Sequence, residues 1–178
     1  MTRARPGLLL PSLIAPLAFS LALSGCGLRP LYAGGAASPV AATLGSVDVA
    51  PIQGKSGWLM ANALRDRLGA MGQGGSAAKY RLTVRLDDDI VGLGTRTDDS
   101  IARERRTLRA RYQLIDAAQG TVVVDATAGS DAGIDVVGSE YATIAAENTA
   151  LERLSDTVAD QIVARLALYA RRTQPSAP

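Results

Sequence analysis

The sequence predicts an α+β domain, a two-layer sandwich in which a four-stranded, mostly antiparallel sheet carries two helices on one face. The predicted order is strand, helix, three strands, helix (β-α-β-β-β-α). Four segments alternate apolar and polar side chains as half-buried strands do, and two longer segments repeat apolar residues at helical spacing. Each strand therefore has one apolar face and each helix one apolar stripe. Packing the helices on a single sheet face buries both.

The first strand and the first helix open the predicted domain. Val47–Ile52 alternates apolar and polar residues, which favours a short strand. Ser56 suits a helix N-cap and Gly72 suits a helix stop. Between them the apolar positions recur at helical spacing: Met60, Leu64, Leu68 and Met71. Trp58 and Met60 are expected to close the core beneath this helix.

Two strands follow, separated by a turn. Tyr80–Leu86 is predicted to be half-buried, because its apolar residues alternate with Arg81, Thr83 and Arg85. The composition of Gly92–Ser100 favours a turn. Ile101–Asp116 is predicted as a long strand, whose apolar face is clearest in its second half: Leu108, Ala110, Tyr112 and Leu114.

The C-terminal part completes the sheet and adds the second helix. Asp116–Gly120 has hairpin-turn composition, and Thr121–Ala128 alternates as a strand. A loop is expected next, because glycine recurs at Gly129, Gly133 and Gly138. The last helix is predicted over Glu140–Arg172, with one apolar stripe: Ile144, Leu151, Leu154, Val158, Ile162, Leu166 and Tyr169.

The N-terminal segment has the features of a lipoprotein signal. Arg3 and Arg5 precede an apolar run that is shorter than the ~20 residues needed to cross a bilayer comfortably. The run ends in Leu23–Cys26, which resembles the lipobox of bacterial lipoproteins, so Cys26 is the expected lipidation site and anchor. Gly27 is not the aspartate associated with inner-membrane retention, which favours the outer membrane. The alternative is a structural cysteine beside an ordinary signal cleavage site.

Processing before Cys26 divides the chain into four parts. These are a signal peptide (1–25), a lipidated N-terminus with a flexible tether (26–45), one α+β domain (46–172) and a disordered tail (173–178). Loss of Arg3 and Arg5 lowers the 19 basic residues to 17, which equals the 17 acidic residues. Net charge therefore gives no reason to expect a nucleic-acid partner.

The residue types present argue against catalysis. The sequence has no histidine and a single cysteine, which excludes histidine- or cysteine-dependent catalysis and the usual zinc sites. The absence of a GxSxG elbow also argues against a lipid-anchored hydrolase. Asp87–Asp89 lacks the spacing of a calcium loop, so we expect a solvated strand end there. A non-enzymatic protein without metal or cofactor is the expectation.

The outer face of the predicted sheet is rich in arginine. The outward positions of the third strand are Arg103, Arg105, Thr107, Arg109, Arg111 and Gln113. Arg81 and Arg85 come from the second strand and Arg96 from the turn. Guanidinium groups about 7 Å apart on one strand face can meet several phosphates or carboxylates at once. The alternatives are a solvated face, partly neutralised by Asp87, Glu104 and Asp125, or a face that lies against another protein.

Four segments resemble one family of lipoproteins. They are "GCGLRPLY" (Gly25–Tyr32), "PIQGKSGWLMANAL" (Pro51–Leu64), "RARYQLIDAAQGTVV" (Arg109–Val123) and "ADQIVARLALYARR" (Ala159–Arg172). Together they are similar to the LptE lipoproteins of the alphaproteobacterial type. The tether and the stretch Gly129–Gly138 depart from the family pattern.

The resemblance implies a binding and assembly role. LptE-like proteins lie at the outer membrane, plug the lumen of the LptD β-barrel, assist its assembly and bind lipopolysaccharide during delivery to the outer leaflet. The arginines named above are then the candidate lipopolysaccharide contacts, with Arg96, Arg103 and Arg109 foremost. Two other lipoprotein roles stay open: an auxiliary component of an ABC-type phospholipid transport system, or a structural envelope protein.

Overall fold

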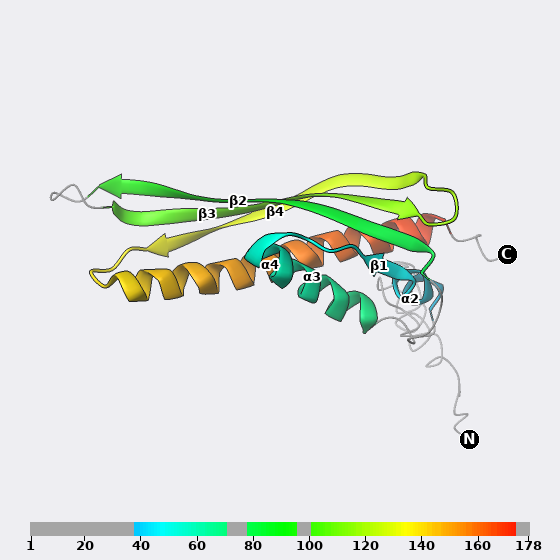
Figure 1. Cartoon of the computed structure of the whole chain (residues 1–178), viewed down its shortest axis with the longest axis horizontal. Coiled ribbons are helices and arrows are strands. Elements are labelled where there is room, and N and C mark those ends of the chain that lie inside the picture. Colours follow the sequence, from blue (N-terminus) through cyan, green and yellow to red (C-terminus); the bar gives the residue numbers. More distant parts are fainter. Residues whose placement is uncertain (1–37, 71–77, 96–100, 174–178) are drawn as a thin grey trace, which may run out of the picture. The chain divides into compact units, whose positions relative to one another are not determined.

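The computed structural model describes residues 38–70, 78–95 and 101–173 (Figure 1). The elements along the chain are α2 (Pro39–Leu44), β1 (Val47–Val49), α3 (Gly54–Gly69), β2 (Tyr80–Thr95), β3 (Ile101–Asp116), β4 (Val122–Asp135) and α4 (Glu140–Arg172). The predicted α+β class is confirmed, with one further short helix, α2, before the first strand.

The sheet has the strand order β1-β2-β3-β4 and is mixed. β1 pairs parallel to β2, with Val47 opposite Tyr80, and α3 makes the crossover that a parallel pair requires. β2 with β3 and β3 with β4 form long antiparallel pairs. Figure 1 shows the helices on one side of the sheet, so only one face of the strands is covered.

β2 and β4 are longer than predicted. Gly92–Ser100 was expected to form a turn, but β2 continues to Thr95, and Arg96–Ser100 lies outside the described residues. Gly129 and Gly133 were expected in a loop, but both belong to β4. The long strand β3 offers a paired partner along both segments. These ladder hydrogen bonds outweigh the low strand propensity of glycine and aspartate.

α2 replaces the last part of the predicted flexible tether. The Ser38 side chain accepts a hydrogen bond of 3.1 Å from the Ala41 amide, and Pro39 occupies the first helical turn. Both features are typical of a helix start. Val40 and Leu44 are buried, so this helix belongs to the core. The part of the predicted tether before Ser38 lies outside the described residues.

The core lies between the inner face of the sheet and the three helices. β3 contributes the predicted alternate residues, and α4 contributes one continuous stripe. The core members of these two elements include Leu108, Ala110, Tyr112, Leu114, Leu151, Leu154, Val158, Ile162 and Leu166. Ile144, which was predicted to belong to this stripe, is exposed instead.

α3 begins at Gly54, two positions before the predicted cap Ser56, and buries only part of the predicted face. Met60 is fully buried, whereas Trp58 is 64% exposed, so the prediction of Trp58 as a core residue is wrong. Residues two apart on a helix do not face the same way. Among the helices in the described ranges, none is both long and apolar enough to span a membrane.

A buried ion pair joins the sheet to α4. The Arg106 guanidinium donates to both carboxylate oxygens of Asp88, at 2.8 and 2.7 Å, and to the backbone oxygen of Glu147 at 2.9 Å. The two side chains are only 11% and 19% exposed. The hydrogen bond to Asp88 raises the pKa of Arg106 above its ordinary value, against the opposing effect of burial. Asp88 is therefore a structural partner, not the solvated strand end that was predicted.

α3 and α4 are also tied by polar contacts at the surface. The Arg67 guanidinium forms ion pairs with Asp156 and Asp160 of α4. The hydrogen bond to Asp160 is the main reason that the pKa of Arg67 is raised. Lys55 donates to the Asn148 side chain at 2.6 Å. These exposed contacts orient the two helices, but each contributes little to stability.

We predict that Asp88→Ala lowers the free energy of unfolding by about 1.5–3 kcal/mol, because it leaves the largely buried Arg106 charge without its carboxylate partner. Urea denaturation of the variant measures this loss. Asp87→Ala is the matched control, since Asp87 is exposed on the opposite face, and it should change stability by less than about 0.5 kcal/mol. Equal effects of the two variants would contradict a structural role for the buried pair.

We predict opposite effects of alanine at two glycines of α3. A Cβ at Gly57 would come within 2.6 Å of the Ile52 carbonyl oxygen, whereas a Cβ at Gly69 meets nothing within 4 Å. Gly57→Ala should destabilise the protein by about 1–3 kcal/mol, because backbone must move. Gly69→Ala should be neutral or stabilising by up to about 1 kcal/mol. Thermal unfolding of both variants separates the two outcomes.

Candidate functional site

The predicted arginine face lies on the side of the sheet that no described helix covers. Arg81 and Arg85 on β2, and Arg103, Arg105, Arg109 and Arg111 on β3, are all exposed. Their positions alternate with the buried residues of the same strands, as the period of a strand requires. Arg96 lies outside the described residues. The structure thus brings six of the seven predicted arginines to one face.

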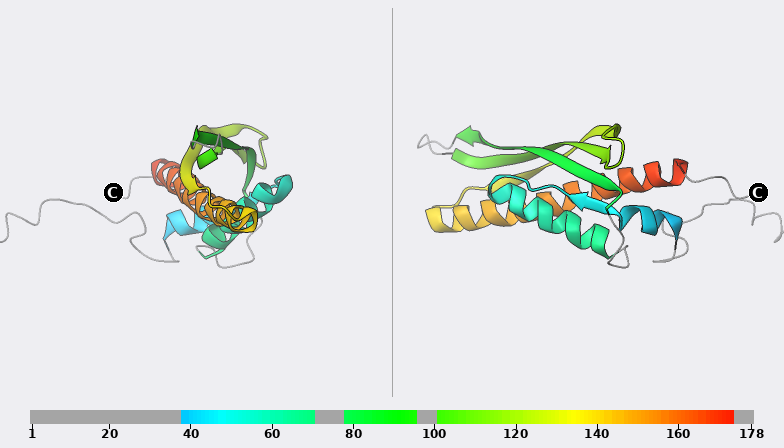
Figure 2. Two further views of the ribbon diagram at one scale, coloured as in Figure 1. Left: turned by 90° about the vertical axis from the view of Figure 1, so that its left-hand side faces the viewer. Right: turned by 45° about the vertical axis from the view of Figure 1, so that its right-hand side comes forward.

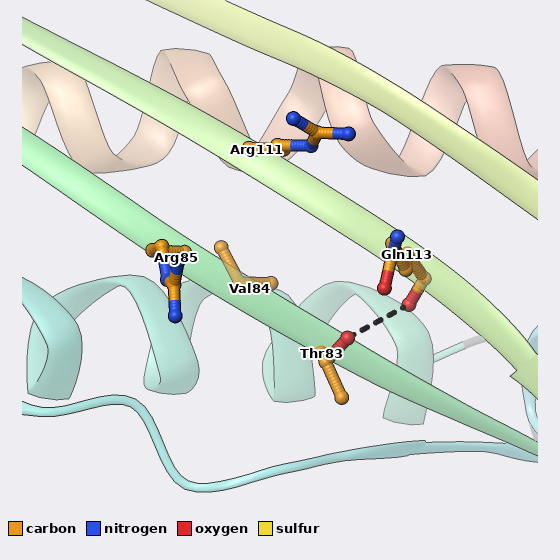
Figure 3. A pocket seen from close by; sticks show the side chains of 5 residues that line it. All are labelled: Thr83, Val84, Arg85, Arg111 and Gln113. Carbon is orange, nitrogen blue, oxygen red and sulfur yellow. Dashed lines mark hydrogen bonds between the residues drawn. The ribbon is translucent and has the colours of Figure 1, made fainter.

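Arg85 and Arg111 lie opposite each other in the pairing of β2 with β3. Figure 3 shows that their guanidinium groups point apart, Arg111 toward β4 and Arg85 away from it. Two like charges on directly opposed positions repel each other, which accounts for this divergence. Beside them, the Thr83 hydroxyl donates to the Gln113 backbone oxygen at 3.4 Å (Figure 3).

Two arginines of this face are neutralised by aspartates of β4. Arg103 forms an ion pair of 2.9 Å with Asp135, and Arg111 forms one of 3.2 Å with Asp125. Asp125 also accepts a hydrogen bond of 2.9 Å from the Gln113 amide. This bond, followed by that from Arg111, lowers the pKa of Asp125 below its ordinary value. Asp125 therefore stays ionised at neutral pH.

The remaining arginines keep their charge available. Within the described part of the chain, none of these four side chains forms an ion pair: Arg81, Arg85, Arg105 and Arg109. The prediction that Asp87, Glu104 and Asp125 partly neutralise the face holds for Asp125. Asp87 forms no ion pair with a described residue. Glu104 occupies an inward position and has one buried carboxylate oxygen without a hydrogen-bond partner among the described residues.

Gly129 gives Arg109 room to cross onto β4. A Cβ at Gly129 would come within 2.6 Å of both Cδ and Nη1 of Arg109, its partner in the strand pairing. The guanidinium of Arg109 can therefore lie against the backbone of β4, where any larger residue would displace it. The sequence predicts a loop at Gly129, and this contact was not predicted. The available signal was that Ala126, Ala128, Ala132 and Ile134 continue the apolar alternation of the strand past Gly129.

Two adjoining hollows lie along this face. One has a volume of about 400 Å³ and is lined by Thr83, Val84, Arg85, Arg111 and Gln113. The other has a volume of about 420 Å³ and is lined by Arg85, Leu86, Asp87, Arg109, Ala110, Arg111 and Thr127. Because Arg85 and Arg111 line both, we treat the hollows as one open feature, the arginine groove. Its guanidinium groups can donate several hydrogen bonds to phosphate or carboxylate oxygens.

The neighbouring acids do not form a metal centre. Asp87 and Asp89 take outward positions of β2, whereas Asp88 points inward to Arg106. No three acidic, histidine or cysteine side chains of the described segments come together as ligands for a metal ion. What the exposed arginines of this face can do is bind anions through their guanidinium groups.

Solved structures of lipoproteins share this fold. A putative lipoprotein from Caulobacter crescentus CB15 is 26% identical, with a TM-score of 0.65, and the match covers 78% of this chain and all of that one (100%). A minor lipoprotein from Acinetobacter baumannii is 17% identical with a TM-score of 0.55, over 72% of this chain and 96% of that chain. Lipoprotein B from Nitrosomonas europaea is 11% identical with a TM-score of 0.54, over 71% and 88%.

Comparison with curated protein sequences gives no match. The family comparison gives one over residues 44–166, from the end of α2 to the last turns of α4, and it is with LptE, described as lipopolysaccharide-assembly. That range is more than half of the chain and includes the whole sheet and the arginine groove. The chain therefore belongs to the LptE family of lipoproteins.

Proposed function

We propose that this protein is an outer-membrane lipoprotein that plugs an LptD-like β-barrel, assists its assembly and binds lipopolysaccharide for delivery to the outer leaflet. Cys26 is the proposed lipid anchor, at the end of the proposed signal peptide. The observation that carries the binding role is the arginine groove, whose free guanidinium groups lie on an uncovered sheet face. Membership of the LptE family supports the assembly role.

The groove suits the phosphorylated part of lipopolysaccharide. Arg85 and Arg109 both line it and have no ion pair among the described residues. A planar guanidinium binds phosphate oxygens in a fork, which gives both charge and geometric complementarity. Such binding would compete with the divalent cations that bridge phosphates between packed lipopolysaccharide molecules. Replacement of the bridging cations by guanidinium groups would then release single lipopolysaccharide molecules for delivery.

The pairing pattern changes the ranking of the arginines. The sequence and the family resemblance predict Arg96, Arg103 and Arg109 as the foremost lipopolysaccharide contacts. Arg103 is paired with Asp135, so it is a weaker candidate than Arg85 and Arg109. Arg81 and Arg105 remain secondary candidates, because they are unpaired within the described segments but do not line the groove.

The same face also suits the inside of a barrel. Outer-membrane barrels of large diameter have polar interiors, and a plug must present a polar surface to them. The exposed strand positions of β2 and β3 supply such a surface, while the helices and the inner strand positions are used for the core. A lipid anchor near the same membrane would keep the domain close to its barrel.

We predict that the double variant Arg85→Ala with Arg109→Ala weakens lipopolysaccharide binding by the full-length protein by about tenfold, because two charge-assisted hydrogen-bonding groups are lost. Titration with purified lipopolysaccharide at low salt measures the change. Arg103→Ala should have a smaller effect. Arg153→Ala on α4, an exposed arginine away from the groove, is the control that should have none.

Asp125→Asn tests the charge of the groove in the opposite direction. It removes the carboxylate that neutralises Arg111, and the variant should bind lipopolysaccharide a few-fold more tightly than the wild type. The affinity differences of the double variant and of Asp125→Asn from the wild type should both become smaller as salt is added, because exposed charges are screened. Unchanged affinity in the double variant and in Asp125→Asn would contradict binding in the arginine groove.

We predict that the full-length protein, purified from outer membranes in mild detergent, brings with it an LptD-like barrel protein. Cys26→Ala should shift the chain out of the outer-membrane fraction, since the anchor would be lost, and depletion of the chain should lower the amount of assembled barrel. Immunoblots of membrane fractions measure both. Recovery of the lipidated protein without any barrel protein would contradict the plug role. It would not affect the titration with lipopolysaccharide, which tests the binding role separately.

A further inference from the structure

A second groove lies between β4 and α4, and the function proposed above does not use it. The helix runs alongside β4 (Figure 2). Two adjoining hollows of about 450 and 210 Å³ lie between these elements and share Arg165. We name the feature the β4–α4 groove. Its lining comes mainly from residues 123–128 of β4 and from Gln161, Arg165, Leu168, Tyr169 and Arg172 of α4, with Tyr112 of β3 as part of its floor.

Gln161 shows which backbone groups face this groove. Its amide nitrogen donates to the Gly129 carbonyl oxygen at 3.3 Å, and its amide oxygen accepts from the Gly129 N–H at 3.1 Å. Gln161 belongs to α4, so these Gly129 groups point away from β3. In an antiparallel strand, alternate residues direct their N–H and C=O groups the same way. The backbone groups of Asp125 and Thr127 therefore also point out of the sheet.

The side-chain amide of Gln161 thus takes the place that a neighbouring strand would take at Gly129. At Asp125 and Thr127 no described side chain makes the equivalent hydrogen bonds. The Asp125 carboxylate is engaged on the outer face by Arg111 and Gln113, so it does not block the edge. This half of β4 keeps an open edge that can accept a further strand.

The helix wall of the groove carries positive charge and an apolar contact. Arg165 and Arg172 are exposed and form no ion pair with any residue in the described ranges. Leu168 between them is 39% exposed. The spacing of these three residues places them on one side of α4, because neighbours three and four apart share a helix face. A strand laid along β4 would meet both a positive and an apolar surface.

We propose that the β4–α4 groove is a strand-addition site for an extended segment of a partner protein, with carboxylates that face Arg165 and Arg172. The N–H and C=O groups of Asp125 and Thr127 pair with the backbone of the segment, as in other complexes formed by strand addition. The arginines select acidic side chains on the face that meets α4. This proposal does not depend on lipopolysaccharide binding or on the barrel.

The other edge of the sheet is less suited to such a partner. β1 covers β2 only from Tyr80 to Leu82, so the later part of β2 also lacks a neighbour. However, Asp87–Asp89 lies on that edge strand, and charged residues there oppose pairing with another strand. The corresponding part of β4, residues 123–128, has only Asp125 as a charged residue.

The test uses the full-length protein in detergent micelles and a short peptide, blocked at both ends, in which valine alternates with glutamate. The control peptide has lysine in place of each glutamate. Hydrogen exchange followed by NMR should show new protection of the Asp125 and Thr127 amides when the glutamate peptide is added. The Ala126 and Ala128 amides, which face β3, should be protected already without peptide.

Charge reversal provides the matched variants. Arg165→Glu should weaken binding of the glutamate peptide by about tenfold and improve binding of the lysine peptide, because the wall charge is inverted. Arg153→Glu, on an exposed part of α4 outside the groove, should change neither. Thr127→Pro removes an edge-facing N–H, so it should fold and lose affinity for the glutamate peptide.

Three results would overturn the proposal. The first is a lack of peptide-dependent protection at Asp125 and Thr127. The second is that the wild type binds the glutamate and lysine peptides with equal affinity, and that Arg165→Glu does so as well. The third is protection of the same amides that rises with protein concentration alone, because the occupant would then be a second copy of the chain.

Discussion

The alternation of side chains along β3 is the constraint on which both faces of the molecule depend. Even-numbered positions from Leu108 to Leu114 are buried against the helices, and odd-numbered positions from Arg103 to Gln113 face outward. Because the side-chain period of a strand is two, a slip of one residue would place the arginines in the core. Burial of the even-numbered apolar residues therefore fixes the strand register, and that register places the odd-numbered arginines on the outer face.

Arginine has different roles on the two faces of the same strand. On the inner face, Arg106 is buried; its Nε and Nη2 donate to Asp88, and its Nη1 donates to the Glu147 carbonyl oxygen of α4. On the outer face, Arg105 and Arg109 have no such partner among the described residues. Because Arg106 is shielded from water, the fold needs these hydrogen bonds: a buried charge without a partner would destabilise it. The exposed arginines lie where water stabilises their charge, and they remain available to a ligand.

The sequence predicted the parts of the fold where one local pattern is strong. β3 and α4 have the predicted bounds, since both have long, regular apolar periods. The strand extensions were missed because Gly92, Gly129 and Gly133 favour turns locally, and the pairing with β3 that overrides this preference is a long-range effect. α2 was missed because a short helix made of small residues has a weak period.

The outer arginines were predictable, but their pairing was not. Alternation alone placed six arginines on one face: Arg81 and Arg85 of β2, and Arg103, Arg105, Arg109 and Arg111 of β3. Which of them are neutralised depends on the register between β3 and β4, which sets Asp135 beside Arg103 and lets Asp125 reach Arg111. The buried position of Arg106 follows from the strand period. The ion pair of Arg106 with Asp88, however, depends on how β2 and β3 are aligned with each other. No local pattern in the sequence specifies that alignment.

The length of α4 has a consequence for how the protein is made. This C-terminal helix packs against α2, α3, β3 and β4, and Tyr169 near its end meets Tyr80 at the start of β2 with ring centroids 6.2 Å apart. A chain synthesised from its N-terminus exposes the apolar residues of β3, such as Leu108 and Leu114, until α4 follows. The hydrophobic core can therefore be completed only after α4 has been synthesised. A nascent or truncated chain without α4 presents an uncovered apolar sheet, the kind of surface that chaperones bind and that aggregates when left unprotected.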